Sequence, residues 1–295
     1  MTIILGILIE GLIYAIMALG VYVTYKILDF PDLSVDSTFP LGAALASTLI
    51  LVGVNPVLSL VFATIAGALA GCVTGLIHVK CKVRDLLSGI IVMTGLYSIN
   101  LRITGGKSNQ PIFSQETIFE NQFLSSYLPE SLSPYVTVII LLIIVLLCKF
   151  LLDLYLKTRS GYLLRAAGDN EVLVTSLAKD KGKVKIIGLA IANAFAALAG
   201  AVYCQQKGYF EITIGTGSMV ISLASVIIGT QFFGRFKKVK ATTAVVCGAV
   251  LYQACVSLAI SFGMEPSDLK LITSMLFLLI LIAGNLKGKK GNIYD

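Results

Sequence analysis

Residues 134–156 read PYVTVIILLIIVLLCKFLLDLYL, and this stretch decides the fold class of the chain. Its only charged side chains are Lys149 and Asp153, both in its second half. About 20 consecutive and mostly apolar residues are enough for a helix to cross the hydrocarbon core of a bilayer. The stretch therefore predicts a membrane-spanning helix.

Eight other stretches have the same character, and the chain of 295 residues is 57% hydrophobic and only 13% charged. An ordinary soluble domain carries about 25% charged residues. We therefore predict an all-α, polytopic integral membrane protein of about nine transmembrane helices, forming one domain over residues 1–295. The other eight expected spans are 3–25, 36–54, 56–79, 85–104, 184–205, 217–234, 241–262 and 269–286.

The residue types that carry most enzyme chemistry are scarce. The chain has one histidine, His78, and no tryptophan, whereas a hydrolytic or metal site needs several converging side chains of this kind. Most cysteines lie inside apolar runs and none forms a CxxC pair, and only Cys81 falls in a short basic segment. We therefore expect no catalytic residue, no metal site and no disulfide.

Basic residues gather in alternate segments between the expected spans. Most of the 23 lysines and arginines lie at 26, 80–84, 157–185, 235–240 and 287–290. Segments rich in lysine and arginine stay in the cytoplasm, which predicts an outside N-terminus and a cytoplasmic C-terminus. The net charge of +7 follows from this topology and indicates no nucleic-acid partner.

The loop 157–185, KTRSGYLLRAAGDNEVLVTSLAKDKGKVK, is polar at its edges and carries a helix pattern in its middle. We expect a turn at Gly168 and then a short helix from Asp169 to Lys179, because Asp169 or Asn170 can cap a helix and Glu171 suits its positive end. The residues expected to make its contacts are Gly168, Asp169, Asn170, Glu171, Leu173, Val174, Leu177 and Lys179.

A helix of about ten residues is not stable alone in water, so this one needs a surface to pack on. Two surfaces fit the pattern. One is the protein's own membrane face or the membrane interface, where the basic flanks would suit anionic lipid. The other is a cytosolic partner protein that changes shape.

The string GYLLRAAGDNEVLVTSLAKDKGKVKIIGLAIANAFAALAGAV, residues 161–202, resembles the cytoplasmic loop and following helix of permease subunits in ABC importers of the branched-chain amino-acid and ribose type. A second segment, LSVDSTFPLGAALAS at 33–47, is similar to the same family. Asp36 stands where the ribose type often has glycine, and DFPDLSVD at 29–36 more closely resembles permeases of the tryptophan and tyrosine transport type. A looser match covers 214–229.

The resemblance implies a bacterial plasma-membrane importer of a small solute, with an amino acid, aromatic or branched-chain, as the expected cargo. It also implies a second permease copy, cytosolic ATP-binding subunits and an extracellular substrate-binding lipoprotein, and it makes the Asp169–Lys179 helix the coupling helix. The alternative is a stand-alone secondary transporter or channel.

An importer needs an energy source, and the chain contains no complete G-x-x-x-x-G-K-[ST] phosphate loop. The nearest approach, Gly105 to Ser108, has Leu101 in place of the first glycine. We therefore expect ATP and magnesium on the partner subunit, and no cofactor in this chain.

The second expected helix has two possible starts. If it begins near Thr38 and ends near Val54, it is about 25 Å long, shorter than the core of a bilayer. Leu33–Ser37 would then enter the membrane unwound and face an internal cavity. The other start is an ordinary capped one at the cytoplasmic interface. The candidates for the substrate path, from this segment and from polar positions inside other spans, are Ser34, Asp36, Ser37, Asn100 and Asn193.

Small residues recur at helix-packing spacing in two spans. They are Gly67, Gly71 and Gly75 in one, and Ala192, Ala196 and Gly200 in the other. Such rows let two helices approach closely. They indicate either packing within the chain or a homodimer seam.

Overall fold

The computed structural model describes residues 2–120, 133–169, 180–233 and 239–261, together with short pieces between 271 and 282. The described part is mostly helical and contains one two-stranded sheet. The elements are α1 (Thr2–Val21), η1 (Tyr22–Ile27), α2 (Val35–Leu51), α3 (Pro56–Lys80), α4 (Asp85–Ile103), β1 (Asn109–Pro111), α6 (Ser133–Tyr155), α7 (Arg159–Asp169), α9 (Lys181–Lys207), β2 (Tyr209–Glu211), α10 (Ser218–Phe233) and α11 (Ala241–Ser261).

Within the described residues, six helices are long and apolar enough to cross a bilayer. They are Ile3–Ile27, Pro56–Lys80, Asp85–Ile103, Tyr135–Tyr155, Lys181–Lys207 and Ala241–Ser261. Two more expected spans, α2 and α10, are apolar but have only 17 and 16 residues, which is about 25 Å of helix. The expected span 269–286 lies mostly outside the described residues. The all-α polytopic class is therefore confirmed, while nine full-length spans are not.

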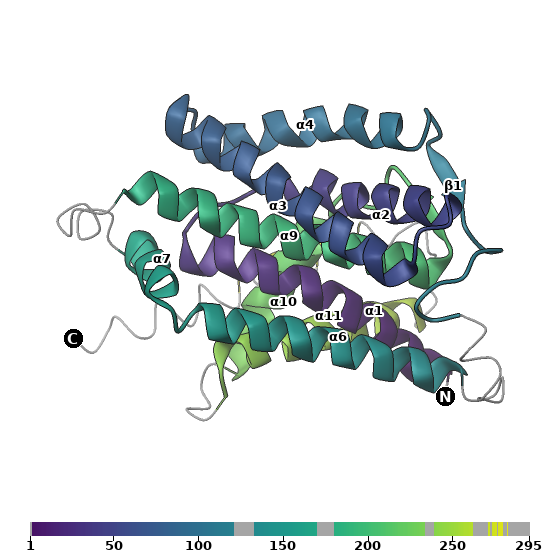
Figure 1. Ribbon diagram of the computed structural model, residues 1–295. Coiled ribbons are helices and arrows are strands. Elements are labelled where there is room, and N and C mark those ends of the chain that lie inside the picture. Colours follow the sequence, from purple (N-terminus) through teal and green to yellow (C-terminus); the bar gives the residue numbers. More distant parts are fainter. Residues whose placement is uncertain are drawn as a thin grey trace.

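α9 is the central helix and packs along α1, α2 and α3 (Figure 1). α3 runs antiparallel to it, as two contacts show. A Cβ atom at Gly67 would overlap the carbonyl oxygen of Asn193, and one at Gly75, further along α3, would meet Ile186, which comes earlier in α9. These glycines let the two backbones touch, as small-residue rows do in membrane proteins. The glycine row of α3 therefore packs against α9 within the same chain.

A second group of helices lies on the other side of α9. α1 packs between α9 and the pair α10–α11, and it also contacts α6. α10 and α11 are antiparallel, with Gly229 against Ala244 and Gly248 against Ser225. α4 packs on α2 and α3 at the outside of the first group (Figure 1).

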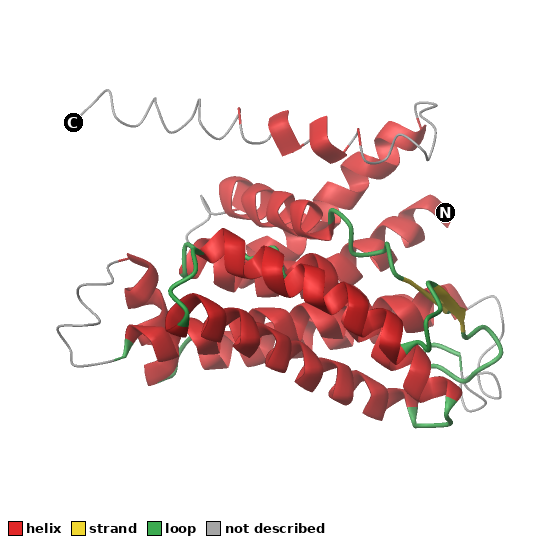
Figure 2. Ribbon diagram, turned by 90° about the horizontal axis from the view of Figure 1, so that it is seen from above, coloured by secondary structure: helices red, strands yellow, loops and turns green. Residues whose placement is uncertain are grey.

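The two ends of the bundle differ in charge. Val79 near the end of α3 contacts Gly182 at the start of α9, so Lys80 and Lys181 come to the same end. We call this the basic end. The opposite end carries the antiparallel pair β1–β2 (Figure 2), in which Asn109 pairs with Glu211, and we call it the sheet end.

The segment after β1 packs against the sheet end as far as Glu120. The amide of Gln205 fixes it there, because its oxygen accepts a hydrogen bond of 3.0 Å from the backbone N–H of Ile118 and its nitrogen donates to the carbonyl of Pro56 at 3.0 Å. This part of the chain forms a cap on the helix ends.

Candidate functional site

The chain between η1 and α2 is irregular and mostly buried. Residues 28–34 have no helical structure, yet Phe30, Asp32 and Ser34 are 2% exposed or less. This differs from the expected unwound stretch Leu33–Ser37, because Val35, Asp36 and Ser37 already lie in the first turn of α2. We call residues 28–34 the break.

The break lies deep in the bundle. Asn193 is about 18 Å along α9 from Lys181 at 1.5 Å per residue, and its side-chain oxygen lies 3.1 Å from the hydroxyl of Ser34. α2 therefore begins opposite the middle of α9. A helix start at the cytoplasmic interface, the alternative allowed by the sequence, does not fit this position.

Asp32 is the centre of a polar cluster in the break. Its Oδ1 accepts hydrogen bonds from the backbone N–H and the hydroxyl of Ser34, at 2.9 and 2.6 Å, and its Oδ2 accepts one of 2.8 Å from Nδ2 of Asn193. The hydroxyl of Thr38 donates to Oδ1 of Asn193 at 2.7 Å. The carboxylate thus holds Ser34, the residue just before α2, and fastens the start of this helix to α9.

Asp36 lies one turn further along and reaches a different helix. Its carboxylate accepts hydrogen bonds from the backbone N–H groups of Met219 and Gly217, at 2.7 and 3.2 Å, and from the hydroxyl of Ser218 at 3.1 Å. It therefore caps α10. The close approach is possible because the backbone of Gly215 touches the carbonyl of Asp36 and the ring of Pro40.

Asn100 joins the same region from α4. Its Nδ2 donates a hydrogen bond of 3.0 Å to the carbonyl of Ser37. The side chain is 1% exposed, and its oxygen has no hydrogen-bond partner among the described residues. All five substrate-path candidates therefore lie at or beside the start of α2, but in three groups. Ser34 and Asn193 belong to the Asp32 cluster, Asp36 caps α10, and Asn100 holds Ser37.

The arrangement places two helix N-termini inside the bundle, each with a carboxylate. Helix N-termini are positive and favour an anionic group. Irregular backbone at membrane depth is tolerated only inside protein or beside a water-filled cavity, and interrupted helices of this kind are typical of transporters, where they line the substrate path.

Comparison with known proteins agrees with this geometry. Residues 3–283 match the family model described as the permease component of branched-chain amino acid transport systems. The chain belongs to this permease family. Permeases of this family are not enzymes themselves, and ATP hydrolysis belongs to the partner subunit.

Three relatives show the range of the family. The permease is 44% identical to the tyrosine transport system permease protein of Clostridioides difficile (strain R20291), over 96% of its own length and 92% of the relative's. It is 29% identical to the ribose import permease protein RbsC of Escherichia coli K12, over 73% and 65% of the two chains. It is 28% identical to the probable branched-chain amino acid transport permease protein LivH of Methanocaldococcus jannaschii, over 73% and 69%. No solved structure matches it.

The described half of the permease's basic-end loop contains a helix that the sequence did not predict. α7 covers Arg159–Asp169, so Gly168 lies in its last turn and not, as expected, in a turn ahead of the next helix. A Cβ atom at Gly168 would overlap the carbonyl oxygen of Ile27. α7 therefore rests on η1, directly before the break.

A second contact strengthens this joint. The side chains of Leu28 and Leu164 meet at Gly188 of α9, and both leucines are at most 4% exposed. Of the expected coupling residues, Gly168 and Asp169 end α7. The others, Asn170, Glu171, Leu173, Val174, Leu177 and Lys179, lie outside the described residues.

Two residues of the site were missed in the sequence, Asp32 and Thr38. The expected spans 3–25 and 36–54 leave Asp32 in a loop between them, because a hydropathy count says nothing of how deep a loop lies. The available signal was the spacing Asp32–Leu33–Ser34, since an aspartate two residues before a serine often accepts a hydrogen bond from its backbone.

Proposed function

We propose that this permease is the membrane subunit of an ATP-driven importer for an amino acid, aromatic or branched-chain. It works as one of two permease copies, with cytosolic ATP-binding subunits and an extracellular substrate-binding lipoprotein, in a bacterial plasma membrane. Its N-terminus is outside and its C-terminus is cytoplasmic, so the basic end faces the cytosol. ATP and magnesium bind the partner subunit.

The contact between α7 and η1 carries this proposal. Gly168 in α7 touches the backbone of Ile27, and the chain then passes through the break to Asp32, which is bonded to Asn193. A displacement of α7 by a motor subunit would therefore reach the break through packed atoms. Energetic coupling between two distant sites is carried by packed side chains and rigid helices that can adopt two discrete arrangements.

The helix expected at Asp169–Lys179 follows α7 directly in the chain. Its apolar stripe, Leu173, Val174 and Leu177, gives the ATP-binding subunit a surface to press on. A short amphipathic helix in a groove of its partner is a common recognition mode.

The cargo is proposed from the relatives. A permease 44% identical over nearly the whole chain is named for tyrosine transport. The segment DFPDLSVD, residues 29–36, covers most of the break and the first two residues of α2. The segment that resembles permeases of the tryptophan and tyrosine transport type thus lies at the proposed path.

Reconstitution in proteoliposomes tests the proposal. The permease is combined with its ATP-binding subunit and substrate-binding protein, and uptake of radiolabelled tyrosine, leucine and ribose is measured with and without ATP. We expect ATP-dependent uptake of an amino acid and none of ribose. Flux that needs no ATP-binding subunit would overturn the proposal in favour of a stand-alone transporter or channel.

Coupling is tested by Leu173→Asp and Leu177→Asp, each of which puts a charge into the expected apolar stripe. Thr175→Asp adds the same charge on the opposite face of that helix and is the control. We expect uptake to fall at least about tenfold for the leucine variants, because a charge buried without a partner costs several kcal/mol. Equal uptake by all three variants would refute the coupling assignment.

A further inference from the structure

A pocket of about 360 Å³ opens at the basic end between η1, α6, α7 and α11. Tyr22, Tyr162 and Thr242 bring hydroxyl groups to its lining. Its charged lining residues are Lys157, Arg165, Lys240 and Asp153. The carboxylate is therefore outnumbered by cations.

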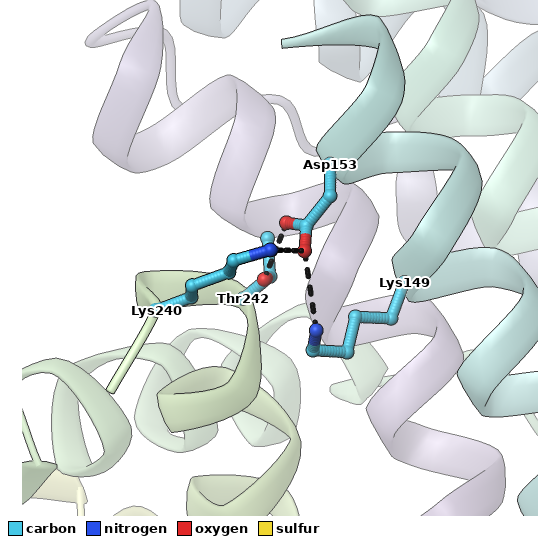
Figure 3. A network of polar contacts seen from close by, with 4 residues as sticks. All are labelled: Lys149, Asp153, Lys240 and Thr242. Atoms are coloured by element: carbon cyan, nitrogen blue, oxygen red, sulfur yellow. Dashed lines mark hydrogen bonds and ion pairs between the residues drawn. The ribbon is translucent and has the colours of Figure 1, made fainter. Parts of the chain in front are cut away.

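Asp153 is already engaged (Figure 3). Its Oδ2 pairs with the ammonium groups of Lys149 at 3.1 Å and Lys240 at 3.2 Å, and its Oδ1 accepts a hydrogen bond of 2.7 Å from the hydroxyl of Thr242. These contacts tie the end of α6 to the start of α11. They also use both oxygens of the carboxylate, so it does not neutralise the remaining cations.

Lys157 and Arg165 are the remaining cations. Among the described residues, neither the ammonium of Lys157 nor the guanidinium of Arg165 has a side-chain hydrogen bond or an ion pair. Two cationic side chains with no acidic partner among the described residues, in a pocket whose lining includes Tyr22 and Tyr162, form a site for a small anion. Guanidinium and ammonium groups bind phosphate oxygens with charge-assisted hydrogen bonds, and arginine can bind two at once.

The position of the pocket indicates which phosphate it meets. α6 ends at Tyr155, α11 starts at Ala241 and η1 ends at Ile27, so the pocket lies where the spans leave the bilayer. In the turn of α6 that precedes the pocket, on the side of the bilayer, the outer surface of the helix is apolar, with Phe150 and Leu151 more than half exposed. Tyr162 is 61% exposed, and tyrosine is enriched at the level of lipid headgroups.

We propose that this pocket binds the phosphate headgroup of an anionic phospholipid, with the acyl chains lying along α6. Lys157 and Arg165 hold the phosphate oxygens, while the pairing of Lys240 with Asp153 keeps α11 in place beside them. Basic pockets between spans on the cytoplasmic side bind anionic headgroups in other membrane proteins. A bound lipid would link α6, α7 and α11, which meet around this pocket.

The test measures lipid retention by the full-length permease. The protein is purified in detergent, mixed with equal amounts of phosphatidylglycerol and phosphatidylcholine, and examined by native mass spectrometry. We expect one tightly retained phosphatidylglycerol per chain. Lys157→Gln/Arg165→Gln should weaken its retention at least about tenfold, because two charge-assisted hydrogen-bond donors are lost.

Two further variants make the result specific. Arg84→Gln/Lys183→Gln removes the same two charges from exposed positions at the same end, and should retain the lipid. Lys157→Arg/Arg165→Lys keeps both charges in the pocket and should also retain it, which separates loss of binding from loss of folding.

Three outcomes would overturn the proposal. The first is equal retention by the pocket variant and the exposed control. The second is phosphatidylcholine held as tightly as phosphatidylglycerol. The third is a rise in the unfolding temperature with inorganic phosphate as large as with phosphatidylglycerol, which would assign the pocket to a soluble anion.

Discussion

The carboxylate of Asp36 in the first turn of α2 accepts a hydrogen bond of 2.7 Å from the backbone N–H of Met219 in the first turn of α10. Two helices too short to cross a bilayer thus meet N-terminus to N-terminus. α2 leads from this point towards α3 at the sheet end. α10 runs the other way, because its antiparallel packing on α11 brings Phe233 towards Ala241 at the basic end.

Both N-termini lie beside carboxylates of the chain itself, because Asp36 bonds to the first turn of α10 and Asp32 bonds to Ser34 just before α2. In transporters with interrupted helices, such ends commonly face an anionic group of the substrate. Here the positive ends are already satisfied, so an anionic cargo is not needed to hold this arrangement together.

We predict that Asp36→Asn lowers the free energy of unfolding by about 1–2 kcal/mol, because the variant loses the charge that stabilises the N-terminus of α10 and one acceptor of its N–H groups. The measurement is the unfolding temperature of the purified permease in detergent. Asp85→Asn is the control, since among the described residues the carboxylate of Asp85 accepts a hydrogen bond only from the backbone N–H of Leu86 in its own helix, at an exposed site. Equal shifts for both variants would contradict the cross-helix role.

We predict that Asp32 and Asn193 are energetically coupled. Asp32→Asn sets two amide donors against each other, and Asn193→Asp sets two carboxylates against each other, so each single variant should lose about 1–3 kcal/mol. The double variant Asp32→Asn/Asn193→Asp restores a donor–acceptor pair and should regain part of this loss.

A double-mutant cycle on the unfolding temperature measures the coupling. Asp29→Asn provides the control, because Asp29 is exposed and asparagine tolerates its positive φ of 51°. Strictly additive losses in the double variant would mean that the two side chains do not interact as described.

Long membrane-crossing helices can be predicted from the sequence, because each one is a continuous stretch of mostly apolar residues that a hydropathy count detects. The expected 56–79 and 85–104 agree closely with α3 and α4, and 134–156 with α6. The break was not predictable to the same degree. Its residues are flanked by apolar ones on both sides, and Asn193, which shows its depth, is 161 residues from Asp32.

α7 was missed for a related reason. Gly161 and Gly168 look like turn residues in the sequence, but both serve close packing inside a helix. A Cβ atom at Gly161 would overlap the carbonyl oxygen of Tyr155, and one at Gly168 that of Ile27. A glycine needed for a close contact cannot be told from one needed for a turn without knowing what lies opposite.

We predict opposite effects for two Gly→Ala substitutions within helices. Gly42→Ala should destabilise the permease by about 1–3 kcal/mol, because its Cβ would overlap the carbonyl oxygen of Ala197. Gly95→Ala has nothing within 4 Å of the added atom and should stabilise α4 slightly, by up to about 1 kcal/mol. Thermal unfolding of both variants checks the signs, and a loss of stability in both would disprove the assigned packing.

We predict that Cys81 is labelled only from the cytoplasm. It is exposed and lies between α3 and α4 at the basic end. A membrane-impermeant maleimide should therefore react with it in inside-out vesicles and not in right-side-out ones. Cys81→Ser identifies the labelled site. Ser108→Cys, at an exposed position of the sheet end, should show the reverse pattern, and labelling of Cys81 from outside would invert the proposed topology.

We predict that Gly168→Ala impairs transport more than it impairs folding. The added Cβ must push α7 away from Ile27, and this shifts the joint through which a motor subunit would act on the break. Uptake in the reconstituted importer should fall several-fold while ATP hydrolysis continues, because the nucleotide site lies on another chain. Gly6→Ala, which meets nothing within 4 Å, should leave both rates unchanged. If uptake by Gly168→Ala falls only in proportion to the amount of folded protein, the joint has no part in coupling.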